Sequence, residues 1–543
     1  MTSTSPTRGR AAGDSAGHAL SAGVGSAGNG ALDAAWVEHV AQAVVASPRG
    51  ETAVTYAPAT GRELARLPRS TAEDVAVAYD GARDVQRSWA QLPVSSRAAI
   101  LLRFHDLVLD HLEDLLDLVQ LETGKTRLNA LEEVVHVASV ARYYARTSER
   151  TLRSRRLVGF VPGLTQVTQV NHPKGVVGIV SPWNYPLSMG ITDALPALVA
   201  GNAVVLRPDP QTPLTALAAV DLLHRAGLPP RVLQVVLGDG PDVGAAVLDA
   251  ADHVCFTGST ATGRTVAVRA AERLVGASLE LGGKNPMYVA ADADVPRAVE
   301  GALRACFSSA GQLCVSVERL LLHETIADEF LAAFVPAVEG LRLGAGLHWD
   351  ADMGSLVSKA QLDRVSAYVD DAVAAGARVL TGGTARPDVG PWFYAPTVLS
   401  DVGPSARLHR EEVFGPVVAV SRVRSDAEAI AAANDTDFGL HASVWTRDHA
   451  RGVAIASLLR AGSVDVDEGY AASFASAAAP MGGMKASGLG RRQGVEGLLR
   501  FTEPQTIAVQ RLAGLGVPDG VAPQTFARVA TGALRVMGRL GRA

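Results

Sequence analysis

The sequence has few of the features that mark secreted, membrane-spanning or nucleic-acid-binding proteins. Only three cysteines occur in 543 residues, too few for a disulfide framework, which indicates a reducing, cytoplasmic compartment. No run approaches the ~20 apolar residues that span a bilayer. The formal net charge of -5 gives no basic surface for nucleic acid. No cluster of Cys and His has metal-ligand spacing, so we expect no metal.

Lysine is also scarce, because only five of the 50 basic residues are lysines. They are Lys125, Lys174, Lys284, Lys359 and Lys485. We interpret the preference for arginine as codon bias, but it makes each remaining lysine worth inspecting. With 48% hydrophobic and 19% charged residues, the chain has the composition of a globular protein with a large core. Its length predicts two or three domains.

The two ends of the chain differ from the rest in composition. Residues 1–30 are rich in Gly, Ala and Ser, and we expect a disordered tail, with a transit peptide as the alternative. No charged segment there precedes a compact apolar one, so no secretory signal is predicted. Residues 513–543 contain a Gly/Pro-rich linker and then a basic helix at 526–542. We expect a solvated or docked tail, with a contact to a partner or a membrane surface as the alternative.

The first half of the chain predicts a Rossmann-type α/β domain. Residues 32–153 have a mostly helical pattern, with one long amphipathic run at 97–121 and a second helix at 127–151. Short apolar strands then alternate with helices, at 175–180, 203–206, 233–237 and 253–256. This alternation predicts a parallel sheet covered on both faces. Ligands should lie at the carboxyl ends of its strands, at 182–186, 207–212, 238–240 and 257–263.

A second strand–helix alternation begins near residue 286. Its expected strands are 287–290, 319–323, 378–381 and 417–423. An extended hairpin is expected at 157–171, and a C-terminal strand at 506–511 could pair with it or with another subunit. The predicted fold class is therefore α/β, with a cofactor domain (31–153 and 174–281), an α/β catalytic domain (282–496) and a small β oligomerisation extension (154–173 and 497–512).

A glycine-rich turn, Gly258-Ser-Thr-Ala-Thr-Gly263, follows the strand at 253–256 and begins a helix. Glycine lets the backbone approach a phosphate, and the helix N-terminus offers free N–H donors. The spacing is neither that of the dinucleotide fingerprint nor that of a Walker loop, since Arg264 stands where the latter needs Lys. A bland tight turn is the alternative, but the strand before it favours pyrophosphate binding at Gly258 and Ser259.

Cys314, in Gly311-Gln-Leu-Cys314, is the candidate nucleophile. A thiol is the best soft nucleophile near neutral pH, yet a lone cysteine is more often a small buried apolar residue. Cys255, inside an apolar strand, and Cys306, on an apolar helical face, fit that ordinary role. Cys314 differs because small and polar residues surround it from 308 to 316.

Two further motifs carry candidate catalytic groups. Glu280, in Glu280-Leu-Gly-Gly-Lys284, lies beside apolar residues that can raise the pKa of a carboxyl group toward neutrality, which suits a general base. The alternative is an ordinary surface glutamate. Asn184, in Pro182-Trp-Asn-Tyr-Pro186, offers an amide that could stabilise an oxyanion.

Taken together, the motifs resemble those of the aldehyde dehydrogenase superfamily over roughly residues 34–510. The matching segments, in order, are 182–186, 256–259, 280–284, 311–314, Glu411-Glu-Val-Phe-Gly-Pro416 and Pro480-Met-Gly-Gly-Met-Lys485. The resemblance implies that Cys314 attacks an aldehyde, and that Asn184 and the Cys314 N–H hold the oxyanion. It also implies that hydride passes to a nicotinamide and that Glu280 activates the water that hydrolyses the thioester.

The same resemblance implies the cofactor contacts and the assembly. Ser259 would touch the pyrophosphate, Glu412 would hold the nicotinamide ribose and Phe414 would lie beside it, whereas Lys284 looks structural. The full set of expected cofactor-binding residues is Trp183, Arg207, Gly238, Gly258, Ser259, Glu412 and Phe414. The family also implies a homodimer or homotetramer.

Within the superfamily, the sequence most resembles the actinobacterial-type NADP-dependent succinate-semialdehyde dehydrogenases, through 207–212, 480–485, 488–494 and 501–503. Two positions depart from common patterns. Many members have Lys at Arg207 and Glu at Pro210; the loss of that carboxylate and an arginine able to pair with a 2′-phosphate favour NADP, with NAD possible as the alternative. Thr192 stands where related enzymes place an Arg for the substrate carboxylate, so another Arg supplies that charge or the substrate is another aliphatic or aromatic aldehyde.

Two rival functions remain open on the sequence. A coenzyme-A-acylating dehydrogenase would release the thioester to a thiol and would need no hydrolytic base, which Glu280 argues against. A catalytically silent binding protein on the same fold could lose Cys314, Glu280 or Asn184, and all three are present.

Overall fold

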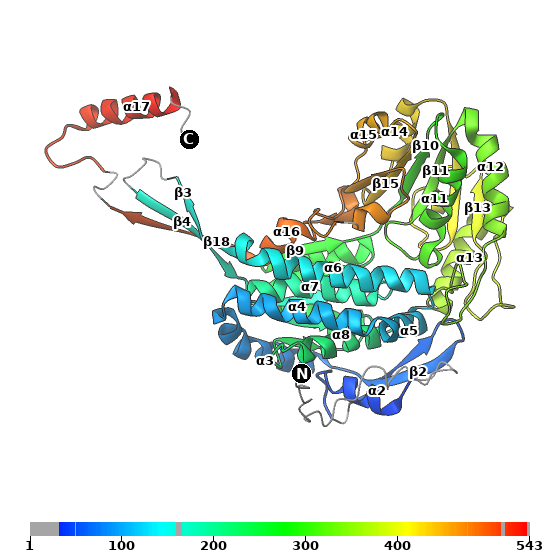
Figure 1. Cartoon of the computed structure of the whole chain (residues 1–543), viewed down its shortest axis with the longest axis horizontal. Coiled ribbons are helices and arrows are strands. Elements are labelled where there is room, and N and C mark those ends of the chain that lie inside the picture. Colours follow the sequence, from blue (N-terminus) through cyan, green and yellow to red (C-terminus); the bar gives the residue numbers. More distant parts are fainter. Residues whose placement is uncertain (1–31, 49, 159–164, 475, 512–515, 540–543) are drawn as a thin grey trace, which may run out of the picture.

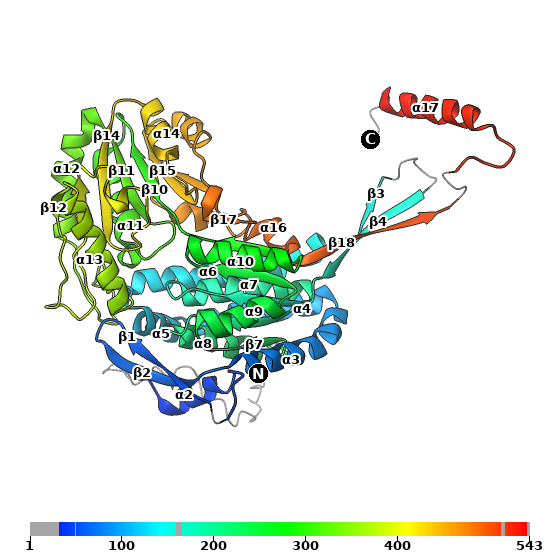
Figure 2. The same cartoon turned by 180° about the vertical axis from the view of Figure 1, so that it is seen from behind.

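The computed structural model describes residues 32–48, 50–158, 165–474, 476–511 and 516–539. The expected N-terminal tail, residues 1–30, lies outside the described residues. Two α/β units lie against each other, and a thin β arm projects from one of them (Figures 1 and 2).

The first unit is built on a six-stranded sheet with the order β17-β9-β8-β5-β6-β7. Its strands are β5 (Val176–Val180), β6 (Ala203–Arg207), β7 (Leu233–Val235), β8 (His253–Thr257), β9 (Gly276–Glu280) and β17 (Gly488–Leu489). All neighbours are parallel except β17, which runs antiparallel to β9. Every residue of β5, β6 and β7 is buried, as a parallel sheet covered on both faces requires. The predicted Rossmann-type sheet is confirmed, with β9 and β17 as additions.

Helices cover both faces of this sheet and form a separate core on each. One face carries α4 (Val94–Asp110), α5 (Leu112–Thr123), α6 (Arg127–Leu152), α7 (Pro186–Ala200) and α8 (Pro213–Arg225) (Figure 1). The other carries α3 (Ala72–Gln91), α9 (Ala245–Ala250) and α10 (Thr260–Glu272) (Figure 2). All residues of α7 are buried, so the loop before it is anchored in the core.

The N-terminal segment differs from the prediction in two details. The amphipathic run at 97–121 is interrupted at His111, whose φ of -105° and ψ of 27° end α4 before α5 begins. The mostly helical character of residues 32–153 is confirmed, starting with α2 (Ala34–Ala41), but β1 (Thr52–Ala57) and β2 (Arg62–Pro68) form an antiparallel hairpin that was not foreseen. Each strand of the hairpin buries only two residues, so its apolar alternation in the sequence is weak.

The second unit is a seven-stranded sheet with the order β12-β13-β14-β11-β10-β15-β16. Its strands are β10 (Asn285–Val289), β11 (Val317–His323), β12 (Arg378–Thr381), β13 (Thr397–Ser400), β14 (Val417–Val423), β15 (His441–Trp445) and β16 (Ser463–Val466). Its helices are α11 (Val295–Phe307), α12 (Glu324–Glu339), α13 (Lys359–Ala374), α14 (Asp426–Asn434) and α15 (His449–Ala456). The four expected strands are present, whereas β13, β15 and β16 were not foreseen.

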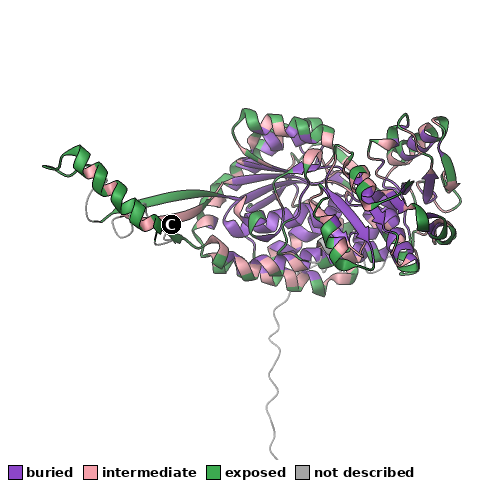
Figure 3. Cartoon of the chain, turned by 90° about the horizontal axis from the view of Figure 1, so that it is seen from above, coloured by how far each residue is buried: buried purple, intermediate pink, exposed green. Residues whose placement is uncertain are grey.

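The arm is a three-stranded antiparallel sheet of β3 (Arg155–Leu157), β4 (Thr165–Pro173) and β18 (Thr502–Gln510). The predicted pairing of the C-terminal strand with the hairpin is confirmed, from Thr502 opposite Pro173 to Gln510 opposite Thr165. The segment expected as strand from 497 starts instead at the end of α16 (Gly494–Leu499). A helix, α17 (Pro523–Arg539), follows the arm, and its residues are exposed or intermediate, with none buried (Figure 3). Among the described helices, none has the length and apolar character needed to cross a bilayer.

Candidate active site

A cavity of about 480 Å³ lies where the carboxyl ends of β5, β8 and β9 meet the loop before β11. Eight of the ten site residues predicted from the sequence line it, namely Trp183, Asn184, Gly258, Ser259, Glu280, Cys314, Glu412 and Phe414. The fold thus brings residues from five separate motifs to one place. Arg207 and Gly238 do not line this cavity. No group of three or more His, Cys, Asp or Glu able to hold a metal occurs in the described part of the chain.

The loop that carries Cys314 begins with an unusual turn. Ser309, Ala310 and Gly311 all have positive φ, of 51°, 55° and 69°. For Ser309 and Ala310 this left-handed conformation is strained, so the surroundings must hold it. Asn129 Oδ1 accepts a hydrogen bond from Ser309 N at 2.9 Å, and Gln312 Nε2 donates to Ser309 O at 3.1 Å. The turn is therefore fixed from two sides before the chain reaches Cys314.

Gly311 is the position in this turn where a side chain would do most damage. A Cβ there would lie 2.0 Å from Gly415 O, in the loop that carries Glu412 and Phe414. We expect Gly311→Ala to lower the free energy of unfolding by about 2 kcal/mol or more, since both φ and space are wrong for alanine. Denaturant titration tests this, with Gly376→Ala as the control: φ is also positive there, but no atom lies within 4 Å. Equal losses in the two variants would show that the contact with Gly415 is unimportant.

Cys314 lies at the edge of a small apolar cluster that includes Leu313, Tyr185 and Met481. It is partly exposed, whereas Cys255 and Cys306 are buried in the core, as predicted. Burial first, and then the charges of Glu280 and Glu412, raise the pKa of the Cys314 thiol to about 12. Without a ligand the group is therefore a thiol, and it needs a base to become a nucleophile.

Asn184 connects the loop after β5 to the nucleophile loop. Its Nδ2 donates to Gln312 O at 2.9 Å, and Gln312 in turn accepts a hydrogen bond from Val357 N at 2.9 Å. One Nδ2 hydrogen remains available for another acceptor, and the side chain lines the cavity beside Cys314. This placement suits a donor to an oxyanion formed at Cys314.

Glu280 ends β9 and has the environment expected of a general base. Its Oε2 is buried and has no hydrogen-bond partner among the described residues. Burial raises its pKa to about 7, although Arg492 and Arg500 oppose the shift. A Cβ on Gly482 would lie 3.0 Å from Glu280 Oε1, so the glycine leaves the carboxylate room. A carboxyl group that titrates near neutrality can both take and return a proton.

The other half of the cavity has the donors and acceptors that a dinucleotide needs. Ser259 caps the N-terminus of α10 and lines the cavity beside Gly258, and a helix N-terminus is a natural site for pyrophosphate. Glu412 is fixed because its Oε1 accepts a hydrogen bond from Gly283 N at 2.8 Å. Trp183 and Phe414 meet edge to face with centroids 5.5 Å apart. This donor set fits a nicotinamide dinucleotide.

The buried pair Lys284–Glu318 supports the Glu412 loop from behind. Lys284 Nζ lies 2.5 Å from Glu318 Oε2, and Glu318 Oε1 accepts hydrogen bonds from Val413 N and Phe414 N, both at 3.0 Å. Lys284 does not line the cavity. Its contacts agree with the structural role implied by the motif.

Arg207 and Gly238 lie at the ends of β6 and of the segment after β7, outside the main cavity. Arg207 donates from Nε and from a terminal nitrogen to Gly238 O, at 2.9 and 2.7 Å, and only 6% of the residue is exposed. Gly238 instead lines a second cavity of about 380 Å³ together with Pro210 and Gln211. The guanidinium is therefore engaged with the backbone rather than open for a 2′-phosphate in this conformation.

The substrate side of the cavity is mainly apolar and aromatic. Its walls include Val135, Met189, Tyr470, Phe474 and Met481. The polar groups on this side include Glu132, whose Oε1 accepts a hydrogen bond from Tyr470 at 2.7 Å, and His136, which burial keeps neutral by lowering its pKa to about 4. Of the residues that line the cavity, the only Arg or Lys is Arg364, on the Glu412 side.

An arginine does reach Thr192, but not from the cavity. Arg492 donates to Thr192 Oγ1 at 3.1 Å and to Asp193 Oδ1 at 2.9 Å. Arg492 is buried and does not line the cavity, and Arg500 pairs with the same Asp193. The positive charge beside Thr192 is thus shared with an aspartate.

The sequence reasoning missed several groups that shape the site. Lys125, Glu133 and Asn129 lie on or before α6, far along the chain from any motif, yet they contact Asn184, Ser188 and Ser309. Lysine scarcity was the one sequence signal for Lys125. Glu133 and Asn129 had none, because their roles arise only when α6 packs beside α7.

Comparison with known proteins identifies the family in which these motifs occur. The profile of the aldehyde dehydrogenase family matches residues 45–507. A Mycolicibacterium smegmatis protein, provisionally named an NADP(+)-dependent succinate-semialdehyde dehydrogenase, is 52% identical over 481 residues, 89% of this chain and 93% of the relative. A rice mitochondrial succinate-semialdehyde dehydrogenase is 38% identical, covering 85% of this chain and 87% of its own. A crystal structure described as an NADP-dependent enzyme of E. coli superposes with a TM-score of 0.82 at 35% identity, covering 86% of this chain and 96% of that one.

Proposed function

Because the chain belongs to the aldehyde dehydrogenase family, we propose that it oxidises an aldehyde to a carboxylic acid with NAD(P), through a thioester on Cys314. The observation that carries the proposal is the convergence of Cys314, Glu280 and Asn184 on one cavity beside the N-terminus of α10. These groups supply a nucleophile, a base titrating near neutrality and an amide donor.

The residues of the chain divide the reaction into two halves. In the first, the Cys314 sulfur adds to the carbonyl carbon, its proton passes to Glu280, and the oxyanion is held by Asn184 Nδ2 and Cys314 N–H. A nicotinamide held beside Trp183, Glu412 and Phe414 would supply the acceptor for the hydride that leaves this carbon. The proton on Glu280 is then released to solvent. In the second half, the Glu280 carboxylate takes a proton from water, the hydroxide adds to the thioester, and the acid leaves as this proton passes from Glu280 to the Cys314 sulfur.

We assign NADP as the preferred cofactor, with NAD as the alternative. The name of the M. smegmatis relative supports this choice, as does Pro210, which contributes no carboxylate of its own to the cavity that Gly238 lines. Since a carboxylate repels a 2′-phosphate and can bind ribose hydroxyls, Pro210→Glu should lower the ratio of kcat/KM for NADP to that for NAD by about tenfold or more. Steady-state kinetics with both cofactors test this; Pro210→Gln is the uncharged control. An unchanged ratio in Pro210→Glu would place the 2′-phosphate elsewhere.

Succinate semialdehyde is the proposed substrate, supported by the names of the M. smegmatis and rice relatives. A second candidate, an uncharged aliphatic or aromatic aldehyde, is favoured by the apolar wall and by Glu132 in the cavity. The kcat/KM for succinate semialdehyde should be compared with those for an aliphatic and an aromatic aldehyde of similar size. A preference for either uncharged aldehyde would replace the first substrate and leave the chemistry at Cys314 unchanged.

We further propose a homodimer or homotetramer in the cytoplasm. The projecting arm with β18 at its edge supports assembly, and three free cysteines support a reducing compartment.

The two rival functions, coenzyme-A acylation and binding without catalysis, have direct tests. Activity only with added coenzyme A would establish acyl transfer, and cofactor binding without turnover of any aldehyde would establish a silent binding protein.

A further inference from the structure

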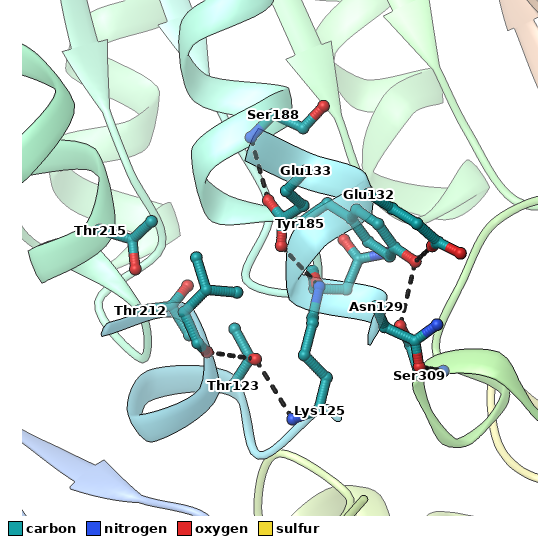
Figure 4. Close-up of polar contacts among 12 residues, drawn as sticks. Thr123, Lys125, Asn129, Glu132, Glu133, Tyr185, Ser188, Thr212, Thr215 and Ser309 are labelled. Carbon is teal, nitrogen blue, oxygen red and sulfur yellow. Dashed lines mark hydrogen bonds and ion pairs between the residues drawn. The ribbon is translucent and has the colours of Figure 1, made fainter. Parts of the chain in front are cut away.

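A buried lysine lies against the loop that carries Asn184, although it does not line the cavity. Lys125, between α5 and α6, has a side chain only 3% exposed. Its Nζ donates to Glu133 Oε1 at 2.6 Å and to Asn184 O at 2.7 Å. The ammonium also lies 3.5 Å from the centroid of the Tyr185 ring, close enough for a cation–π contact. The ammonium therefore interacts with residues 184 and 185 and with one carboxylate. Lys125, Glu133 and Tyr185 are labelled in Figure 4.

Glu133 connects Lys125 to the first turn of α7. Its Oε2 accepts a hydrogen bond from Ser188 N at 3.0 Å, in the first turn of α7. The Lys125–Glu133 pair thus binds the carbonyl just before α7 and an amide just inside it. A carboxylate at a helix N-terminus is favourable, but burial of an ion pair adds little net stability. Its effect here is on the position of the loop.

The position of the Asn184 loop affects the surroundings of the Cys314 nucleophile. Asn184 Nδ2 donates to Gln312 O, two residues before Cys314. A shift of the Asn184 backbone by a fraction of an ångström would therefore change the donor geometry at the oxyanion. Donors of this kind act only within a narrow distance range.

We propose that the buried Lys125–Glu133 pair positions Asn184 as the oxyanion donor of Cys314. Lys125 is a positioning residue in this account, because it acts through Asn184 and touches no reacting atom. The inference rests on the proposed function, since it presumes that Cys314 forms an oxyanion.

Two reagents separate positioning from general damage. p-Nitrophenyl acetate acylates a thiol through an oxyanion and needs no cofactor. Iodoacetamide alkylates the same sulfur without forming an oxyanion. In Lys125→Met we expect acylation of Cys314 to fall by about 10–100-fold, and in Asn184→Ala by about 10²–10³-fold. Alkylation should change by less than about threefold in both. The double variant should be no slower than Asn184→Ala alone, because Lys125 acts through that residue.

Multiplicative losses in the double variant, or an equal fall in alkylation, would overturn the proposal and make Lys125 a purely structural residue. If Lys125→Met does not fold, Lys125→Met/Glu133→Gln removes both buried charges, and the same acylation loss is expected. Arg451→Met, which breaks an ion pair with Asp426 on α14, controls for loss of stability and should leave both rates unchanged. Wild-type protein that is alkylated but never acylated would instead refute the proposed function.

A second inference concerns α17, which none of the above explains. The helix buries no residue. It lies beside the arm, away from the six- and seven-stranded sheets (Figures 1 and 3). Its arginines Arg528, Arg535 and Arg539 lie at i, i+7 and i+11, so they share one face. The opposite face is formed by Phe526, Val529, Ala533, Val536 and Met537. Val529 and Val536 are 66% and 56% exposed.

We infer that α17 lies on an anionic lipid surface. Residues 520–543 contain four arginines and no Asp or Glu, so the arginines have no acidic partner along the helix and their charge remains for external anions. An apolar face running the length of the helix opposite a basic one is the pattern of a helix that lies in the membrane interface. The chain would then be a peripheral protein held by this helix.

Vesicle flotation of the full-length protein tests the inference. We expect binding to phosphatidylcholine vesicles containing phosphatidylglycerol, little binding to pure phosphatidylcholine, and release by salt. Replacing the three arginines with Gln should weaken binding by about fivefold for each one removed. Val536→Asp should abolish it while aldehyde oxidation is unchanged. Failure to float, or a change of oligomeric state on removal of residues 521–543, would overturn the inference and assign the helix to a second copy of the chain.

Discussion

Cys314→Ala should lower kcat for aldehyde oxidation by about 10⁵-fold or more, as loss of a covalent nucleophile does in other enzymes. Asn184 and Glu280 would remain in place, but neither can form the thioester from which hydride leaves. Cofactor binding should persist, because the groups around α10 and Glu412 are untouched. Steady-state kinetics, with binding of NADPH followed by its fluorescence, measure the two effects separately.

Cys306→Ala is the matched control for this variant. Cys306 is the same size but lies buried in the core of the second sheet, 1% exposed. Its loss should lower the melting temperature and leave kcat within about twofold, since it is a core substitution and Cys306 does not line the cavity. Residual activity of Cys314→Ala above 1% of wild type, or a comparable loss in Cys306→Ala, would contradict a thioester on Cys314.

The high pKa of Cys314, about 12, shapes how the nucleophile is used. A thiol with this pKa is almost wholly protonated at neutral pH, so it is protected from adventitious oxidation but also inactive. The negative charges of Glu280 and Glu412 contribute to this by opposing a thiolate. When Glu280 takes the proton from the thiol, it acts as the base and loses its own negative charge. It then no longer repels the thiolate.

The parts of the fold that were predictable are those with strong local patterns. Strands such as β5 and β6 are fully buried, so each appears in the sequence as a mainly apolar run, which in β6 ends at Arg207. The β1–β2 hairpin was missed because it alternates weakly and contains a bulge between Thr55 and Tyr56. The break at His111 was missed because the apolar spacing continues across it.

The site residues also divide into those that the sequence could predict and those that it could not. Cys314, Glu280 and Glu412 follow or precede strands in distinctive motifs, and strand ends of parallel sheets gather at one edge. The left-handed turn at 309–311 and the role of Lys125 could not be predicted, because both depend on contacts with α6. Arg207 shows the converse, since its residue type indicates a free guanidinium and only the structure reveals its bonds to Gly238.

Glu280→Gln should separate the two halves of the reaction. Acylation and hydride transfer would still occur once, if more slowly, but hydrolysis should slow by about 10²–10⁴-fold, because no base remains to activate water. Rapid mixing should therefore show one equivalent of reduced cofactor per site followed by a very slow phase. Mass spectrometry should find the acyl group on Cys314. Glu503→Gln, on the exposed arm with its side chain 65% exposed, is the control and should behave as wild type.

The pH dependence gives an independent check on the same residue. The carboxylate form of Glu280 is the base, and its pKa is about 7. Activity limited by hydrolysis should therefore rise with pH, reach half its maximum near pH 7 and level off above that, since protonation removes the base. In Glu280→Gln the residual rate should lose this inflection. If the inflection persists in the variant, or if full turnover continues without an acyl intermediate, another group activates the water and the unpartnered Oε2 of Glu280 serves a different purpose.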